Sequence, residues 1–292
     1  MPELQVVATR GSVVESRHRV HAVAVQGDAV VAQAGDPAVV CHLRSAAKPF
    51  QALPLVRARD DLTPAEVAIA CASHRALPEQ LAAVRSLLAR AGAVEDDLEL
   101  GPDPTKLEHN CSGKHAGMLA LCRARGWDTV GYRLAEHPVQ QACAAEVLAA
   151  AGAQAQDVPT AVDGCGVVTF ALPLERMALM FARLEEREGG AVVAAAMRAH
   201  PELIRGPGAP DTVLMETDAG WLAKGGAEGL LCAAGPEGLG VALKVEDGAG
   251  RALGPALAAF LGPLGRELSS LAVVPLVNSR GEVVGELAAR AV

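Results

Sequence analysis

The stretch HRVHAVAVQGDAVVAQAG, residues 18–35, predicts an antiparallel hairpin, because apolar residues alternate on both sides of the turn sequence QGD. LAVVPLVNSRGEVVGEL, residues 271–287, predicts a second hairpin near the other end of the chain. Further strand-like runs begin near residues 221, 229 and 238. The strands therefore gather at both chain ends, which favours an α+β fold with an antiparallel sheet over alternating βαβ units.

Helical patterns fill the middle of the chain. TPAE, residues 63–66, has the residues of a capping box and predicts a helix toward Cys71. EQLAAVRSLLARA, residues 79–91, has apolar residues at helical spacing. Further helices are expected near 112–124, 138–151, 173–187, 191–199 and 252–262, and a surface loop at 205–210. We predict a single catalytic unit, with a sheet from about 1–43 and 221–292 and a helical part at about 44–220.

Composition excludes several classes of function. The net charge of -8 and the 2% aromatic content disfavour binding to nucleic acid, which needs basic residues and stacking platforms. No apolar stretch approaches the ~20 residues of a membrane span, and MPELQVVATRGS lacks the pattern of a signal peptide. Seven cysteines form an odd set without a dense framework, which predicts reduced thiols in the cytoplasm.

Residues 44–50, RSAAKPF, contain the pattern S-x-x-K at Ser45 and Lys48. Three residues along a helix bring both side chains to one face, so the lysine amine can reach the serine hydroxyl. A lysine whose pKa is lowered by burial or by a nearby cation such as Arg44 can take the proton of a nucleophilic serine. The pattern is short and also fits a helix that begins with a capping serine.

Two later residues extend this pattern. Ser73 ends the capped helix, and Lys244 lies in the strand-like run GLGVALKVEDG, residues 238–248. Enzymes that use S-x-x-K follow it with a second serine and then a lysine on a late strand. Lys244 therefore fits a catalytic role, although a charged residue that protects an edge strand gives the same pattern.

A dense reactive cluster, HNCSGKH, occupies residues 109–115, and a second cysteine lies in DGCG, residues 163–166. Three interpretations fit. Cys111 can be a thiolate nucleophile with His109 or His115 as its base. Cys111 and Cys165 can share a metal ion, although the spacing matches no standard zinc finger. The cluster can also be an ordinary helix N-terminus whose polar groups are satisfied.

These residues belong to a longer series of motifs, which resembles that of the Rhizobium-type (class 3) L-asparaginases. The series consists of RSAAKPFQALPL, CASH, KLEHNCSGKHAGMLALC, HPVQ, DGCGVVTFALPL and GLGVALKVEDG, in family order from residue 44 to about 251. The resemblance implies a fold like that of serine β-lactamases and glutaminases. It also implies hydrolysis of asparagine to aspartate and ammonia by a homodimer.

The resemblance further implies roles for individual residues. Ser45 would attack the amide with Lys48 as its base, and Ser73 with Lys244 would relay protons to the leaving ammonia. Arg44, His74 and Asp163 would lie at the substrate, and Asp163 would either support the metal site or hold the substrate's amino group. His74, His109 and His115 would be supporting residues rather than catalysts. A zinc ion would be held by Cys111, Lys114 and Cys165, with water as the fourth ligand.

Two departures from the family pattern affect the expected pocket. Arg75-Ala76-Leu77 stands where Ser-Gly-Glu is usual, and Val168 stands where proline is usual. Substrate preference is therefore open. The alternatives are another serine–lysine amidase, such as a glutaminase or a β-lactamase-like enzyme, and a zinc-binding module that is not an enzyme.

Overall fold

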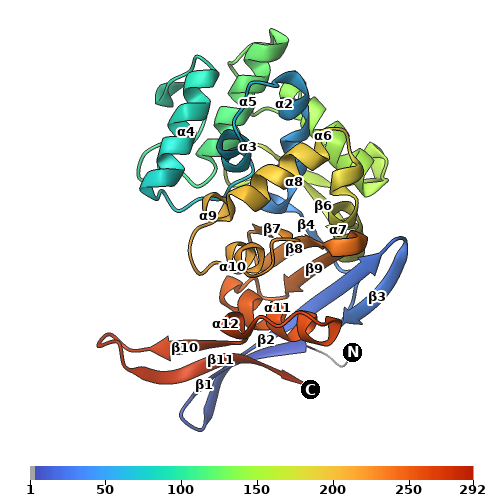
Figure 1. Ribbon diagram of the computed structural model, residues 1–292, viewed down its shortest axis with the longest axis vertical. Helices are drawn as coiled ribbons and strands as arrows, with labels where there is room; N and C mark the ends of the chain where they lie inside the picture. Colours follow the sequence, from blue (N-terminus) through green and yellow to red (C-terminus); the bar gives the residue numbers. More distant parts are fainter. Residues whose placement is uncertain (1–3, 292) are drawn as a thin grey trace. The chain divides into compact units, whose positions relative to one another are not determined.

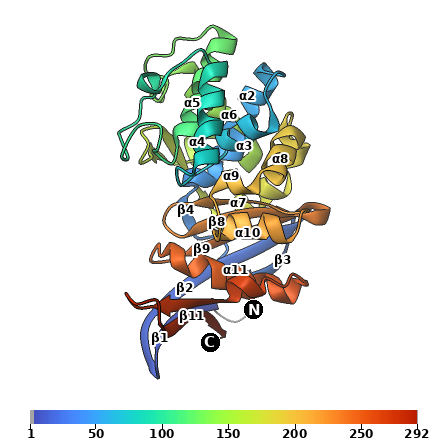
Figure 2. The ribbon, with the colours of Figure 1, turned by 60° about the vertical axis from the view of Figure 1, so that its left-hand side comes forward.

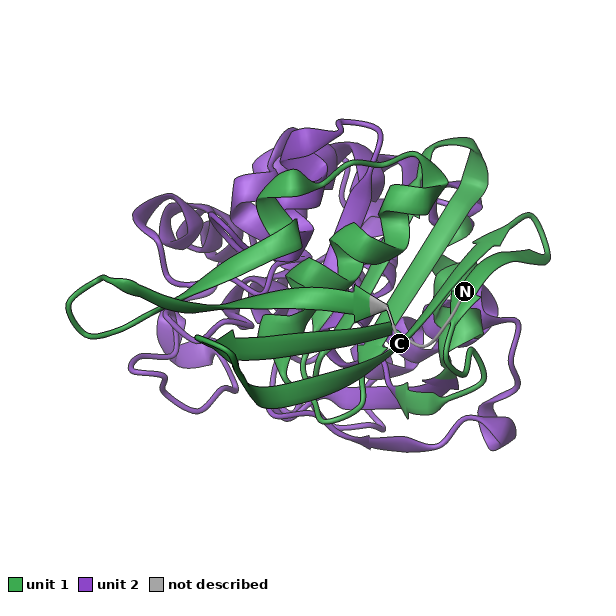
Figure 3. Ribbon diagram, turned by 90° about the horizontal axis from the view of Figure 1, so that it is seen from below, with its two compact units in different colours: residues 1–41, 173–182, 225–292 green, residues 42–172, 183–224 purple. Residues whose placement is uncertain are grey.

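The computed structural model describes residues 4–291, which form two compact units (Figure 3). Unit 1 comprises the described parts of residues 1–41, 173–182 and 225–292. Unit 2 comprises residues 42–172 and 183–224. Residues 173–182 lie within the predicted helical part, about 44–220, but they belong to unit 1, which contains most of the sheet.

The main sheet has eight strands in the order β10-β11-β1-β2-β9-β8-β7, with β3 paired to β2 (Figure 1). The strands are β1 (Leu4–Arg10), β2 (Val13–Gln26), β3 (Ala29–Ala34), β7 (Leu222–Gly226), β8 (Leu230–Gly235), β9 (Leu239–Val245), β10 (Val273–Val277) and β11 (Val283–Ala291). Both predicted hairpins, β2–β3 and β10–β11, are antiparallel pairs. The α+β fold with a sheet from both chain ends is therefore confirmed.

The long strand β2 organises unit 1. Its first half pairs with β1 and its second half with β3, while β9 lies along its other edge. Residues 20–25 are all buried, so both faces of the sheet are covered there. The helix α7 (Leu174–Ala182) packs on β2, β8 and β9, and a Cβ at Gly240 would lie 2.0 Å from the carbonyl oxygen of Ala178. A second helix, α11 (Leu253–Leu261), packs on β1, β9 and β11.

Unit 2 is largely helical, as predicted for the middle of the chain. Its helices are α1 (Lys48–Gln51), α2 (Leu53–Ala58), α3 (Pro64–Ala70), α4 (Pro78–Arg90), α5 (Ser112–Arg125), α6 (Pro138–Ala151), α8 (Gly190–Ala199), α9 (Pro201–Ile204) and α10 (Pro210–Thr217). Short helical turns complete the chain: η1 (Arg44–Ala47), η2 (Glu95–Asp97), η3 (Ala155–Asp157), η4 (Leu184–Glu186), η5 (Pro236–Gly238), η6 (Gly250–Ala252), η7 (Gly262–Leu264) and α12 (Ser269–Ala272).

Helices α3, α4 and α5 lie side by side in unit 2 (Figures 1 and 2). The predicted capping box is present, because the Thr63 hydroxyl accepts from the Glu66 N–H and the Glu66 carboxylate accepts from the Thr63 N–H. Helix α3 therefore begins at Pro64 and ends next to Cys71. The loop that follows carries Ser73.

A second sheet, of three strands, was not predicted. Its order is β4 (Val40–His42), β6 (Val168–Pro173) and β5 (Thr160–Val162). All three residues of β5 are exposed, so this strand lacks the alternation that marks a half-buried strand in a sequence. No helix of the described residues is long and apolar enough to cross a membrane.

Candidate active site

The hydroxyl of Ser73 lies between two lysine side chains of unit 2. Lys48 Nζ, at the start of α1, and Lys224 Nζ, on β7, are each 2.9 Å from Ser73 Oγ. Lys48 Nζ also donates to the carbonyl oxygen of Ala72. The backbone N–H of Ser73 donates to the carbonyl oxygen of Ile204 at 2.8 Å, which holds the serine in the loop after α3.

These three side chains are removed from solvent, with exposed fractions of 1% for Lys48, 1% for Ser73 and 0% for Lys224. Two nitrogens that share one oxygen at 2.9 Å are at most about 6 Å apart, so two ammonium charges there would repel strongly. Burial, and then the charge of Lys48, lowers the pKa of Lys224 to about 7. Burial also lowers the pKa of Lys48. At least one neutral amine can therefore accept the Ser73 proton near neutral pH.

Ser45 lies in the short helical turn η1, three residues before Lys48, and is partly exposed. The Lys48 N–H donates to the carbonyl oxygen of Ser45, so the backbone closes one turn between them. Within the described part of the chain no hydrogen bond joins the two side chains, because the Lys48 amine is turned to Ser73. Arg44 has φ 48°, a strained value for a residue with a side chain, and such strain is typical of functional sites.

The prediction that Lys244 pairs with Ser73 is wrong. Lys244 lies on β9 in unit 1, where its amine donates to the carbonyl oxygens of Glu228, at 2.8 Å, and of Val245. Lys224 contacts Ser73 instead. Both lysines interrupt apolar strand-like runs, and WLAKGG carries the same signal as GLGVALKVEDG. Pattern alone does not show which lysine is buried beside the serine.

Arg44 and Asp163 form an ion pair, with Arg44 Nε 2.5 Å from Asp163 Oδ1. Asp163 sits in the tight turn between β5 and β6, where it accepts from the N–H of Gly164 at 2.8 Å. Its backbone N–H donates to the carbonyl oxygen of Val167, and a positive φ of 85° at Gly166 completes the turn. The pair therefore places one cation and one anion beside η1.

The side chains of Cys111, Lys114 and Cys165 come together in unit 2. Lys114 Nζ is 2.9 Å from Cys165 Sγ, and the thiols of Cys111 and Cys165 are hydrogen-bonded. That hydrogen bond, helped by Lys48 and Lys114, lowers the pKa of Cys111, whereas the pKa of Cys165 is raised. Burial alone would lower the pKa of Lys114, but the two thiols outweigh it and raise the pKa. The cluster therefore brings one amine and two thiols into contact.

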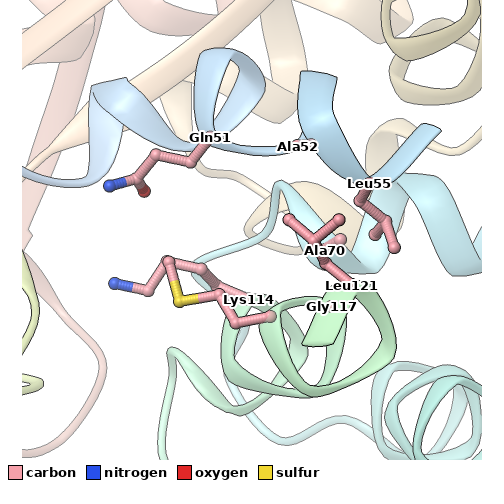
Figure 4. A pocket seen from close by; sticks show the side chains of 8 residues that line it. Gln51, Ala52, Leu55, Ala70, Lys114, Gly117 and Leu121 are labelled. Carbon is pink, nitrogen blue, oxygen red and sulfur yellow. The ribbon is translucent and has the colours of Figure 1, made fainter. Parts of the chain in front are cut away.

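Two thiols are usual zinc ligands, and the Lys114 amine can complete the donor set when it is neutral, because only the neutral amine has a free electron pair. In residues 4–291 no group of three His, Cys, Asp or Glu side chains is gathered as a metal site, so a site here depends on Lys114. A small cavity lined by Leu55, Ala70, Gly117 and other residues lies beside Lys114 (Figure 4). Its lining is mainly apolar, and the amide of Gln51 and the amine of Lys114 are its polar side-chain groups.

His74 was predicted at the substrate, but both of its ring nitrogens are used within the protein. Nδ1 accepts from the N–H of Ala76 at 3.1 Å, and Nε2 lies 2.8 Å from the hydroxyl of Ser112. Burial, and then the charge of Lys48, lowers the pKa of His74 to about 4, so the ring is neutral. A substrate finds no free nitrogen on this ring.

The comparison with known protein families agrees with these motifs. The sequence profile of the family described as L-asparaginase II matches residues 6–289. No curated protein matches significantly. A solved structure titled as a putative beta-lactamase from Bacteroides dorei DSM 17855 is similar, with a TM-score of 0.45 and 13% identity over 83% of this chain and 93% of that one. Because the family profile spans nearly the whole chain, the protein belongs to the L-asparaginase II family.

Proposed function

We propose that this chain hydrolyses the side-chain amide of asparagine through an acyl-enzyme on Ser45. Membership of the L-asparaginase II family supports a hydrolase that acts on amides. The observation that carries the mechanism is the Ser73 hydroxyl held between the buried amines of Lys48 and Lys224. A neutral amine in such a cluster is a base that works near neutral pH.

Ser45 is the better nucleophile of the two serines, because it is partly exposed whereas Ser73 is buried with two amines on its oxygen. In the first half-reaction, Ser45 Oγ bonds to the amide carbon and gives its proton to neutral Lys48. The amine of Lys48 turns from Ser73 to Ser45 about its flexible four-carbon stem. The C–N bond then breaks, and the proton leaves with the nitrogen as ammonia.

In the second half-reaction, water attacks the Ser45 ester. The water gives one proton to the base, its oxygen bonds to the acyl carbon, and Ser45 recovers its hydroxyl as the acid leaves. Ser73 and Lys224 pass protons to and from Lys48, which the two 2.9 Å contacts allow. A pKa of about 7 suits Lys224 to this exchange, since it can gain and lose a proton near neutral pH.

The Arg44–Asp163 pair provides recognition for a free amino acid. Asparagine carries a carboxylate and an ammonium group, and these complement the guanidinium of Arg44 and the carboxylate of Asp163. The pair holds both charges in a fixed position at 2.5 Å before substrate arrives. It therefore favours a zwitterionic substrate over an uncharged amide.

We also propose that Cys111, Lys114 and Cys165 hold a zinc ion. Zinc supplies Lewis acidity, and when bound it holds both thiols as thiolates and the lysine as a neutral amine. The 2.9 Å contact between Lys114 and Cys165 supports this, because it already brings an amine and a thiol together.

The expected homodimer and cytoplasmic location belong to the same proposal, and the seven free cysteines support a reducing environment.

The test is ammonia release from asparagine, glutamine and an uncharged amide, with intact-protein mass spectrometry to detect the acyl-enzyme. Ser45→Ala should abolish the acyl adduct and nearly all ammonia release. Ser279→Ala, on an exposed turn, is the matched control and should behave as wild type. An adduct that persists in Ser45→Ala and disappears in Ser73→Ala would move the nucleophile to Ser73. Nitrocefin turnover without ammonia release would favour a β-lactamase.

A further inference from the structure

We propose that His74 is a positioning residue, which locks the loop of Ser73 to the first turn of α5 through Ser112. The part that concerns catalysis rests on the proposed role of Ser73. The lock itself is a property of the fold, and it connects the two groups of reactive side chains described above. It also gives a fully buried histidine a purpose other than substrate contact.

The lock is made of hydrogen bonds on both sides of His74. Its backbone N–H donates to the carbonyl oxygen of Asn110 at 3.2 Å, and its Nε2 is 2.8 Å from Ser112 Oγ. Asn110 and Ser112 flank Cys111, and Ser73 precedes His74. A single residue thus links the neighbours of Cys111 to the neighbour of the Ser73 hydroxyl.

The direction of these hydrogen bonds follows from their partners. The Ala76 N–H donates to Nδ1, so the ring proton is on Nε2 and is donated to Ser112. Ser112 has one hydroxyl proton, which it gives to the carbonyl oxygen of Leu107 at 2.7 Å. Its oxygen is therefore free to accept from His74. The chain of bonds is satisfied in one orientation only, which fixes the ring.

Close packing between helices α5 and α3 also holds the loop of Ser73 beside the start of α5. A Cβ added at Gly113 would lie 2.2 Å from the carbonyl oxygen of Ile69, and one at Gly117 would lie 3.1 Å from Ala70 Cβ. Helix α5 is thus pressed against the end of α3, three residues before Ser73. Since α5 also carries Lys114 and begins beside Cys111, the serine–lysine cluster and the cysteine cluster share one rigid support.

Loss of the lock should lower kcat more than it changes KM. Ser73 would no longer be held at 2.9 Å from both amines, and proton transfer depends steeply on such distances. Substrate binding should change little, because His74 is buried and has no ring nitrogen left for a ligand. A residue that contacted the substrate would instead raise KM.

The experiment compares four variants of the full chain. His74→Phe removes both ring hydrogen bonds, and Ser112→Ala removes the acceptor of one. His74→Gln keeps a donor near the position of Nε2, whereas His74→Asn keeps an acceptor near the position of Nδ1. The readouts are kcat and KM for ammonia release, and the rate of Cys111 alkylation by iodoacetamide in chelator-treated protein, followed by mass spectrometry.

We expect His74→Phe and Ser112→Ala to lower kcat by about 10-fold to 100-fold, as for a buried hydrogen-bonding group left without its partner. KM should stay within about threefold, and Cys111 should be alkylated faster. His74→Gln should restore most of both properties and His74→Asn should not. The combined loss in kcat should be smaller than the product of the two separate losses, because both changes break the hydrogen bond between His74 and Ser112.

Equal behaviour of the Gln and Asn variants would overturn the proposal, and so would a rise in KM at unchanged kcat. If the wild-type chain releases no ammonia from any amide, the proposed function fails, but the alkylation rates still decide whether the lock exists. Wild-type alkylation of Cys111 in both His74→Phe and Ser112→Ala would show that it does not. If Phe and Ala misfold, the Gln and Asn pair carries the test.

Discussion

Lys224 offers the sharpest quantitative prediction, because its environment makes folding depend on pH. The pKa of Lys224 is lowered to about 7 in the folded chain, from the ordinary value of 10.5 that applies in the unfolded chain. Between these values the folded chain has lost the proton that the unfolded chain still binds. The unfolded state then binds more protons, so the free energy of unfolding rises with pH from about 7 to about 10.5.

The size of the effect follows from the same two values. Between about pH 7 and 10.5 the lysine is protonated in the unfolded chain and neutral in the folded chain. Each pH unit in this range then changes the free energy of unfolding by about 1.4 kcal/mol. Lys224→Met keeps much of the side-chain volume and removes the titrating amine. The slope of stability against pH should therefore be lower in Lys224→Met than in wild type by up to about that amount.

The assay is urea unfolding of both proteins at pH values from about 7 to about 9, where the two-state free energies can be compared. Lys244→Met makes the same change of side chain and net charge outside the serine cluster, and serves as the control. Parallel slopes for wild type and Lys224→Met would refute the reasoning, because they would mean that Lys224 carries the same charge in both states. In active wild type, kcat/KM should also rise with pH through about 7, since the amine must be neutral to accept a proton.

Three further substitutions test the site and its support. Lys244→Gln should leave kcat within about twofold of wild type, because its amine donates to the backbone carbonyls of Glu228 and Val245 in unit 1; a near-complete loss of ammonia release would restore the original assignment. Gly113→Ala should lower the free energy of unfolding by about 2–4 kcal/mol in urea, since its Cβ would meet the Ile69 carbonyl oxygen at 2.2 Å; unchanged stability would show that α5 can shift freely. Asp163→Asn should raise KM for asparagine by about tenfold or more with a smaller change in kcat; an effect confined to kcat would argue against substrate recognition.

Local pattern was enough to predict most of the elements. Alternating residues identified the terminal hairpins, and Thr63 with Glu66 marked the start of α3, because hydrogen bonds within a few residues determine both features. The strands β5 and β6 were missed for a related reason. β5 is short and exposed, and no local signal separates such a strand from a loop.

Local sequence patterns identified only part of the candidate site. Ser45, Lys48, Ser73 and the cysteine cluster could be singled out because each lies in a motif with unusual composition. The choice between Lys224 and Lys244 could not be made, since both are lysines in apolar strand-like runs. The partners of His74 could not be predicted either, because Ser112 and Asn110 lie more than thirty residues away in the chain.

The sequence by itself determined the fold class, the family and the motifs that hold Ser45, Lys48, Ser73 and the cysteine cluster, since these follow from periodicity and from residue patterns along the chain. Only the tertiary structure decided which lysine contacts Ser73, which groups are buried deeply enough to change their pKa, and which histidine nitrogens already form hydrogen bonds within the protein. The physical reason is that burial and hydrogen bonding are made by residues distant in the chain, and neither leaves a mark in the local pattern.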